Sequence, residues 1–259
     1  MQQLTDRLDR TVIIRATPDV VFRFFTDTPR WAAWWGEGST IDARVGGALF
    51  IRHPGGTEVS GVVEELRPPE RIAFTYGYVK GTPIPAGGSR VVITLRPDHA
   101  GTRLDLTHEF TDAVARDEHV QGWRFQLSLF ANVVTDEVNA NAVELVDAWF
   151  DAWAEADLAA RNRTLTRIAG PDVHFHDRYS NLDGQTDLSA HITAAQRFMP
   201  GIRLHRDGGV RHCQGIVLAD WVARNTEGKD LMRGTNVFVL GPRGQIESVT
   251  GVATPAAAR

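Results

Sequence analysis

The most constraining feature of the sequence is a series of five short β-rich segments followed by a long amphipathic helix. Turns rich in glycine and proline separate these segments, which are ALFIRH, EVSGVVEELR, RIAFTYGYV, SRVVITLRPD and TRLDLTHEF. Residues 118–138 then carry apolar side chains at three- and four-residue steps, which predicts a helix with one apolar face. TVIIRA and the segment after Pro18 add a strand and a helix in front. We therefore expect an antiparallel sheet crossed by a long helix, with a ligand cavity between them.

The second half of the chain also mixes helices and strands, but in a different order. NANAVELVDAWFDAWAEAD predicts an amphipathic helix, and shorter helices are expected at 158–169 and 187–198. The expected strands are DVHFHD, GIRLHRDGGVRH, GIVLADWVARN, LMRGTNVFVLG and QIESVTGV. Because 259 residues are comfortable for two cores, we predict two α+β domains, at 1–138 and 139–259.

Charge and composition exclude several classes of function. The chain has 28 lysine and arginine residues against 32 aspartate and glutamate residues, so it lacks the basic excess of a nucleic-acid-binding protein. No apolar run approaches the ~20 residues that span a bilayer, and the first ten residues are too polar for a signal peptide. The single cysteine, Cys213, fits a reducing compartment or indifference to one. We expect a cytoplasmic protein without membrane insertion.

Five segments of the first half together resemble a known superfamily. VIIRATPDVVFRFFTDTPRWAAWWG, DARVGGALFIR, GVVEELRPPERIAFTY, TRLDLTHEF and QGWRFQLSLF occur in the order and spacing of the SRPBCC superfamily. Over residues 10–138 the chain is similar to the bacterial homologues of the activator of heat-shock protein 90 ATPase. The resemblance implies a START-like helix-grip fold in which the long helix closes a hydrophobic cavity. It does not imply a chaperone partner.

The wall of that cavity should consist of large aromatic side chains with a few polar tips. Tyr76 and His108 are the most specific candidates for ligand contacts, because a polar group inside a cavity needs a hydrogen-bond partner that a ligand or a water can supply. The alternative is that these residues are ordinary core packing. The full set of candidates is Trp34, Trp35, Phe50, Phe74, Tyr76, His108, Phe110, Trp123 and Leu127.

Residues 142–252 resemble the SnoaL-like polyketide cyclases and ketosteroid isomerases of the nuclear transport factor superfamily. The resemblance depends on a first helix that ends in EAD, on AGPDVHFHDRYSNLDGQTDLSAHI and on GPRGQIESVTGV. It implies a cone-shaped α+β barrel. Asp177 stands where the isomerases carry their catalytic base. Trp149, and Thr235 or Asn236, stand where those enzymes carry the groups of the oxyanion hole, so a hole of that type is missing.

Strand alternation supports an inward position for Asp177, since Val173 and Phe175 should face the core and His174 and His176 the other side. In an apolar cone desolvation would raise the pKa of Asp177 toward the useful range for a general base. The alternative is an aspartate that caps the turn through NLDG. The other candidates of this half are Asn236 and His191 as catalytic residues, Arg233 as an assisting group, and Trp149, Tyr179 and Trp221 as ligand contacts.

Metal and cofactor motifs are not expected. His174 with His176, and His212 with Cys213, suit zinc or copper, but no third ligand stands at a recognisable spacing. The sequence also contains no phosphate-binding loop, nucleophile elbow or HExxH helix. We therefore predict no metal and no cofactor.

Two hypotheses about function remain open. The first is a protein that binds a small hydrophobic molecule, such as a lipid, polyketide or aromatic compound, with cyclase, isomerase or lyase activity through Asp177. The second is a non-catalytic ligand-binding or co-chaperone-like protein whose second domain forms a homodimer.

Overall fold

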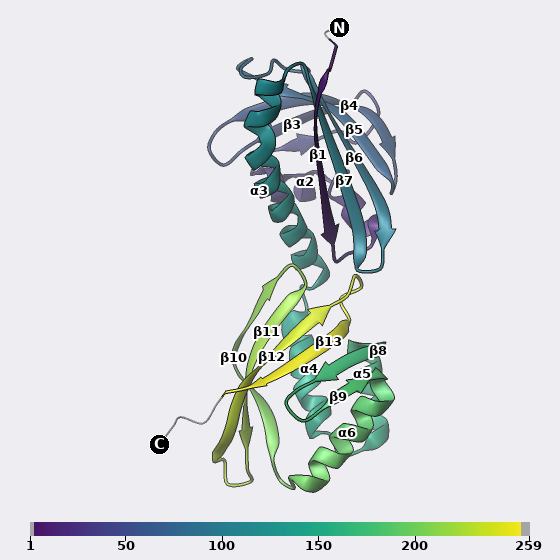
Figure 1. Cartoon of the computed structure of the whole chain (residues 1–259), viewed down its shortest axis with the longest axis vertical. Helices are drawn as coiled ribbons and strands as arrows, with labels where there is room; N and C mark the ends of the chain where they lie inside the picture. The colour runs from purple at the N-terminus through teal and green to yellow at the C-terminus, as the bar shows by residue number, and fades with distance from the viewer. Residues whose placement is uncertain (1–2, 255–259) are drawn as a thin grey trace. The chain divides into compact units, whose positions relative to one another are not determined.

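The computed structural model describes residues 3–254 and divides the chain into two compact units, one ending at Glu137 and the other starting at Val138. Each unit combines helices with one sheet, so the predicted α+β class is confirmed (Figure 1). Within residues 3–254 no helix is both long and apolar enough to cross a membrane. Each unit is described by itself below.

The first unit contains a seven-stranded antiparallel sheet in the order β1-β7-β6-β5-β4-β3-β2. Its strands are β1 (Asp6–Ile14), β2 (Thr40–Ile41), β3 (Ala48–Arg52), β4 (Glu58–Arg67), β5 (Arg71–Tyr78), β6 (Ser89–Asp98) and β7 (Gly101–Phe110). Its helices are α1 (Pro18–Arg23), α2 (Thr28–Trp35) and α3 (Ala113–Val138). The five predicted strand segments and the long helix are therefore present.

Local chemistry fixes the short helix α2, which carries three tryptophans. The Asp27 carboxylate accepts a hydrogen bond from the Arg30 amide and caps its first turn. The helix ends at Gly36, whose φ of 133° only glycine adopts readily. A Cβ at Gly36 would lie 2.2 Å from the Arg52 carbonyl oxygen, so the end of α2 lies directly against β3.

The core of the first unit lies between α2, α3 and the sheet. The Phe25 and Phe130 rings stack with centroids 5.0 Å apart, and the Trp34 ring lies 4.7 Å from Phe130. These side chains are almost fully buried, and burying each one contributes roughly 1.5–3 kcal/mol. α3 therefore holds the aromatic side chains of α2 and the preceding segment in fixed positions.

The second unit contains a six-stranded sheet in the order β10-β11-β12-β13-β8-β9. The strands are β8 (Ala169–His176), β9 (Asn181–Asp183), β10 (Arg203–Cys213), β11 (Ile216–Arg224), β12 (Asp230–Leu240) and β13 (Ile246–Ala253), and the helices are α4 (Ala142–Ala154), α5 (Leu158–Ile168) and α6 (Gly184–Phe198). All pairs are antiparallel except β13 with β8. In the described part of the chain β10 and β9 are edges, so the sheet is open and does not form the closed barrel of the predicted cone.

One face of this sheet packs on the helices. Val173 and Phe175 are buried, as strand alternation predicts, whereas His174 and His176 are only partly buried. Between α5 and α6, the buried Arg161 side chain donates hydrogen bonds to Ser189, Thr193 and Gln196 and to the Glu155 carbonyl. Burial lowers the pKa of Arg161. The guanidinium group therefore ties the two helices together through neutral oxygen atoms.

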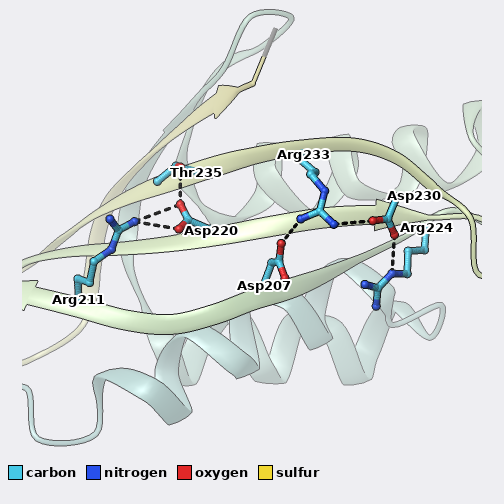
Figure 2. Close-up of polar contacts among 7 residues, drawn as sticks. All are labelled: Asp207, Arg211, Asp220, Arg224, Asp230, Arg233 and Thr235. Carbon is cyan, nitrogen blue, oxygen red and sulfur yellow. Dashed lines mark hydrogen bonds and ion pairs between the residues drawn. The ribbon is translucent and has the colours of Figure 1, made fainter. Parts of the chain in front are cut away.

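The other face of the sheet carries a row of ion pairs, which Figure 2 shows. Arg211 donates to both oxygens of Asp220 at 3.0 and 3.1 Å, and Thr235 donates to the same carboxylate at 2.6 Å. Further along the strands, the residues Asp207, Arg233, Asp230 and Arg224 form a continuous series of alternating charges. Exposed pairs of this kind contribute little stability individually, but they keep this face polar.

Candidate ligand-binding pocket

A pocket of about 480 Å³ opens in the first unit between α2, β5 and α3. This volume lies within the ~300–1,000 Å³ range of small-molecule sites. The lining residues come from the end of α2, the loop after β3, strand β5 and one face of α3. They are Ala33, Trp34, Trp35, Gly36, His53, Pro54, Tyr76, Tyr78, Glu118, His119, Gly122, Trp123, Phe125, Gln126 and Leu129.

Aromatic rings form most of the wall. The Trp34 and Trp35 rings lie 4.1 Å apart between centroids, and the Trp35 and Trp123 rings meet edge to face at 5.7 Å. Tyr76 and Tyr78 project from the same side of β5, with their rings 5.9 Å apart. Aromatic pairs prefer offset and edge-to-face geometries of this kind, so the wall is a packed and preformed surface.

Tyr78 belongs to a hydrogen-bond chain that ends on the backbone of α3. The Nδ1 atom of His119 lies 2.7 Å from the Ala115 carbonyl, which can only accept, so this nitrogen carries the proton. In the neutral ring Nε2 then accepts from the Tyr78 hydroxyl at 3.0 Å. Burial lowers the pKa of His119 and raises the pKa of both tyrosines. All three groups are therefore neutral near pH 7.

A second chain lies behind the wall. The Trp123 indole N–H donates to Nδ1 of His108 at 2.9 Å, which leaves the ring proton on Nε2. Nε2 donates to the Ser89 hydroxyl at 2.8 Å, and that hydroxyl donates to the Tyr76 carbonyl, also at 2.8 Å. Burial, reinforced by the nearby His119, holds the pKa of His108 well below its usual range. His108 is a neutral structural residue whose two ring nitrogens are both occupied.

Two ring systems of the lining, those of Trp35 and His53, have no hydrogen-bond partner among the described residues. The Trp35 indole nitrogen is enclosed by protein atoms and is not presented to the open space. The His53 ring packs edge to face on Trp35 at 5.5 Å, and burial lowers its pKa. His53 is therefore neutral near pH 7, and its ring nitrogens are available to a bound molecule.

The structure places the predicted wall residues in three locations. Four of them line the pocket, namely Trp34, Trp35, Tyr76 and Trp123. Another four are buried behind the wall, namely Phe74, His108, Phe110 and Leu127. The structure differs most from the prediction at Phe50, which lies on the opposite face of β3 because Leu49 and Ile51 occupy the core side.

Sequence reasoning missed several lining residues, although some could have been found from spacing. Tyr78 is two residues after Tyr76 and so shares its face of β5. His119 stands four residues before Trp123 on α3, which places both on one helix face. His53 lies in the loop after β3, and no local pattern brings that loop to the pocket.

In the second unit, Asp177 lies at a turn just after β8. Its carboxylate accepts the Tyr179 amide at 2.8 Å, and its own amide donates to the Ser180 carbonyl at 3.0 Å. The side chain is partly buried. The carboxylate thus caps the turn at 177–180, directly before NLDG, and the role of Asp177 as a general base stays a prediction.

The other candidates of the second unit surround one part of its core. A Cβ added at Gly251 would lie 3.2 Å from Cβ of Asp177 and 3.5 Å from Oδ1 of the buried Asn236, so these side chains flank one position. His191 lies 3.2 Å from the Ser180 hydroxyl and packs on Phe175. The indole nitrogens of Trp149, Trp153 and Trp221 are buried without a partner among the described residues.

Two predicted groups lie outside this part of the core. Tyr179 is 82% exposed and contacts no cavity, which differs from its predicted role as a ligand contact. Arg233 forms ion pairs with Asp207 and Asp230 on the polar face of the sheet.

The histidine pairs considered as metal ligands have other partners. His174 pairs with Asp183 at 2.7 Å, and His176 lies 3.1 Å from the Thr250 hydroxyl. His212 accepts the Gly215 amide at 2.9 Å. Within residues 3–254 there is no group of three or more His, Cys, Asp or Glu residues placed to hold a metal ion.

Comparison with models of known protein families gives a match within the first unit. Residues 15–135 match the family of Activator of Hsp90 ATPase homolog 1-like proteins, which confirms the resemblance of the N-terminal half. No curated protein sequence matches the chain.

Several solved structures are similar to parts of the chain. A protein from Chromobacterium violaceum is 29% identical and covers 49% of this chain and 96% of its own, with a TM-score of 0.41. The Aha1 dimer from Colwellia psychrerythraea is 19% identical and covers 48% and 93%, with a TM-score of 0.40. A structure assigned to the SnoaL-like family from Agrobacterium tumefaciens is 24% identical and covers 44% and 97%, with a TM-score of 0.42.

Proposed function

We propose that the first unit binds a small hydrophobic molecule in the pocket between α2, β5 and α3. The observation that carries this proposal is a space of about 480 Å³ lined by six aromatic side chains, Trp34, Trp35, Tyr76, Tyr78, Trp123 and Phe125. The Trp123 N–H is donated within the protein and Tyr76 is almost fully buried, so the wall recognises a ligand mainly by apolar contact. Lipids, polyketides and aromatic compounds all fit this description.

The test is a substitution that fills the pocket without removing an existing contact. Gly122 lines the pocket on α3, and a Cβ added there meets no atom within 4 Å. Gly122→Phe therefore puts a ring into the open space. Gln121→Phe adds the same ring to the exposed neighbouring position, which does not line the pocket, and is the matched control.

The assay is native mass spectrometry of freshly purified protein, followed by release and identification of any bound molecule. We expect a co-purifying or added hydrophobic ligand to bind the original protein and Gln121→Phe, but not Gly122→Phe. Equal binding by Gly122→Phe would contradict the use of this pocket.

A second candidate function is proton-transfer chemistry of the cyclase, isomerase or lyase type in the second unit, with Asp177 as general base and Asn236 and His191 assisting. The observation that favours it is the position of Asp177 and Asn236 beside Gly251. Asp177→Asn should abolish turnover of an identified substrate while leaving the fold intact. Unchanged turnover would remove the general-base role.

The proposal also includes a cytoplasmic location and a homodimer formed through the second unit. The single exposed cysteine is compatible with a reducing compartment. A dimer through the sheet would have to cover the row of ion pairs on β10, β11 and β12. Analytical ultracentrifugation at two salt concentrations tests this arrangement, because salt weakens contacts between exposed charges. A monomer at every protein and salt concentration would refute the dimer.

A further inference from the structure

The lining of the pocket has an unbalanced charge. Among its residues, all of which the structure describes, Glu118 is the one carboxylate, and there is no lysine or arginine. Glu118 is exposed at the start of the helical face and forms no ion pair with a described residue. Burial is the main reason that the pKa of Tyr78 is raised, and the charge of Glu118 raises it further. The negative charge of Glu118 therefore acts on the groups inside the pocket.

No other lining group supplies a compensating positive charge. His53 and His119 line the pocket, and burial lowers the pKa of both, so each is neutral near pH 7. A ligand with a carboxylate or phosphate group would meet Glu118 and no cation. The electrostatics of the pocket thus disfavour an anion.

The remaining hydrogen-bonding capacity of the lining consists mainly of acceptors. The N–H of Trp123 and the hydroxyl proton of Tyr78 are already donated within the protein, and Tyr76 is almost fully buried. Gln126 donates to the Trp34 carbonyl. The Glu118 carboxylate, the carbonyl oxygen of Gln126, a lone pair of Tyr78 and the His53 ring, which offers one N–H and one acceptor nitrogen, remain. A ligand that donates protons or carries positive charge satisfies these groups, whereas a ligand rich in acceptors does not.

The aromatic side chains of the wall also favour a positively charged ligand. Tryptophan and tyrosine faces attract organic cations, and recognition of quaternary ammonium groups commonly uses several such rings around one cation. The pocket has five tryptophan and tyrosine side chains, together with Phe125, which is 68% exposed on α3. A ring that remains exposed beside the pocket can close over a ligand without losing a core contact.

We propose that the pocket of the first unit takes an apolar molecule that ends in a tertiary or quaternary ammonium group, with Glu118 as its counter-charge. This inference rests on the proposed ligand-binding function and specifies the class of ligand. Apolar contact holds the body of the molecule, and the aromatic faces and the carboxylate select its charge.

The test compares three probes that differ in charge but little in shape, measured by tryptophan fluorescence and calorimetry on the full chain. They are benzyltrimethylammonium, its neutral carbon isostere neopentylbenzene, and the anion 3-phenylpropanoate. Each is titrated into the original protein, Glu118→Gln and Asp117→Asn. Asp117 lies next to Glu118 on α3 and pairs with Arg116 outside the pocket, so Asp117→Asn makes the same change in net charge without touching the lining.

We expect the cation to bind more tightly than both other probes. Glu118→Gln should weaken its binding by about two- to five-fold, the range for an exposed charge pair. Asp117→Asn should leave it unchanged. If neopentylbenzene binds as tightly as the cation, or if Glu118→Gln changes the affinity for the cation no more than Asp117→Asn does, the ammonium inference is overturned while the pocket remains a ligand site. If none of the three probes binds, the proposed function of the pocket fails with it.

Discussion

Replacing Ser89 by alanine should destabilise the first unit far more than the loss of one small hydroxyl suggests. Ser89 is the middle of the chain that runs from Trp123 through His108 to the Tyr76 carbonyl. It is both an acceptor for the ring N–H of His108 and a donor to the carbonyl. The substitution therefore leaves a buried donor and a buried acceptor without partners.

The magnitude follows from the burial of these groups. Ser89 and His108 are both 1% exposed or less, so water cannot replace the missing hydroxyl without opening the core. An unsatisfied buried polar group costs about 1–3 kcal/mol. His108 cannot avoid the loss by changing tautomer, because its Nδ1 must stay unprotonated to accept from Trp123. We therefore expect Ser89→Ala to lower the free energy of unfolding by about 2–4 kcal/mol.

The assay is urea unfolding followed by tryptophan fluorescence, which reports on Trp123 at the other end of the chain. Ser60→Ala is the matched control, since Ser60 lies on β4 and forms no side-chain hydrogen bond with a described residue. It should change stability by less than about 0.5 kcal/mol, as a surface substitution does. A loss for Ser89→Ala no larger than that for Ser60→Ala would refute the assigned chain of donors and acceptors.

Three further predictions concern other parts of the chain. Burial lowers the pKa of His53, His108 and His119, so below the ordinary histidine pKa of about 6.5 the unfolded chain binds protons that the folded unit does not. The free energy of unfolding should therefore fall as the pH drops from 7.5 to 5.5, by up to about 1.4 kcal/mol per pH unit for each histidine that stays neutral. A urea midpoint that does not change with pH would contradict this. Arg161→Ala should cost the second unit about 2–5 kcal/mol in urea unfolding, since it leaves a cavity and several unpaired acceptors, and a loss below about 1 kcal/mol would argue against the assigned network. Gly61→Ala should lower the melting temperature, because its Cβ would lie 1.8 Å from the Thr75 carbonyl oxygen. Gly122→Ala, whose Cβ meets no atom within 4 Å, should instead stabilise α3 by about 0.5–1 kcal/mol. A higher melting temperature in calorimetry for Gly61→Ala than for Gly122→Ala would refute the close approach of the β4 and β5 backbones at Gly61.

Periodicity predicted most of the elements, but not α2, β2 or β9, where the expected turn through NLDG contains a short strand. It was less informative about the faces of the strands. Alternation placed Val173 and Phe175 in the core correctly because polar histidines separate them. It could not orient β3, where Leu49, Phe50 and Ile51 are all apolar, so the choice of face depends on pairing with β4. β1 begins at Asp6, earlier than expected, because charged side chains are tolerated on an edge strand.

The pocket was predictable as a location but only in part as a set of residues. Aromatic composition indicated Trp34, Trp35, Tyr76 and Trp123 as wall residues. The position of His108 behind the wall depends on Ser89 and Trp123, which approach it from different elements. Contacts of this kind are set by tertiary packing and leave no local signal in the sequence.

The order of strands in the second unit has a consequence for how it assembles during synthesis. β13, the last strand of the described chain to be made, lies between β12 and β8 in the middle of the sheet. Until it emerges from the ribosome, the hairpins of β10, β11 and β12 cannot join β8 and β9. The first unit has no such delay, because all seven of its strands precede α3. The nascent chain can thus complete its N-terminal sheet while the second remains two separate fragments that a chaperone or a neighbouring nascent chain could engage.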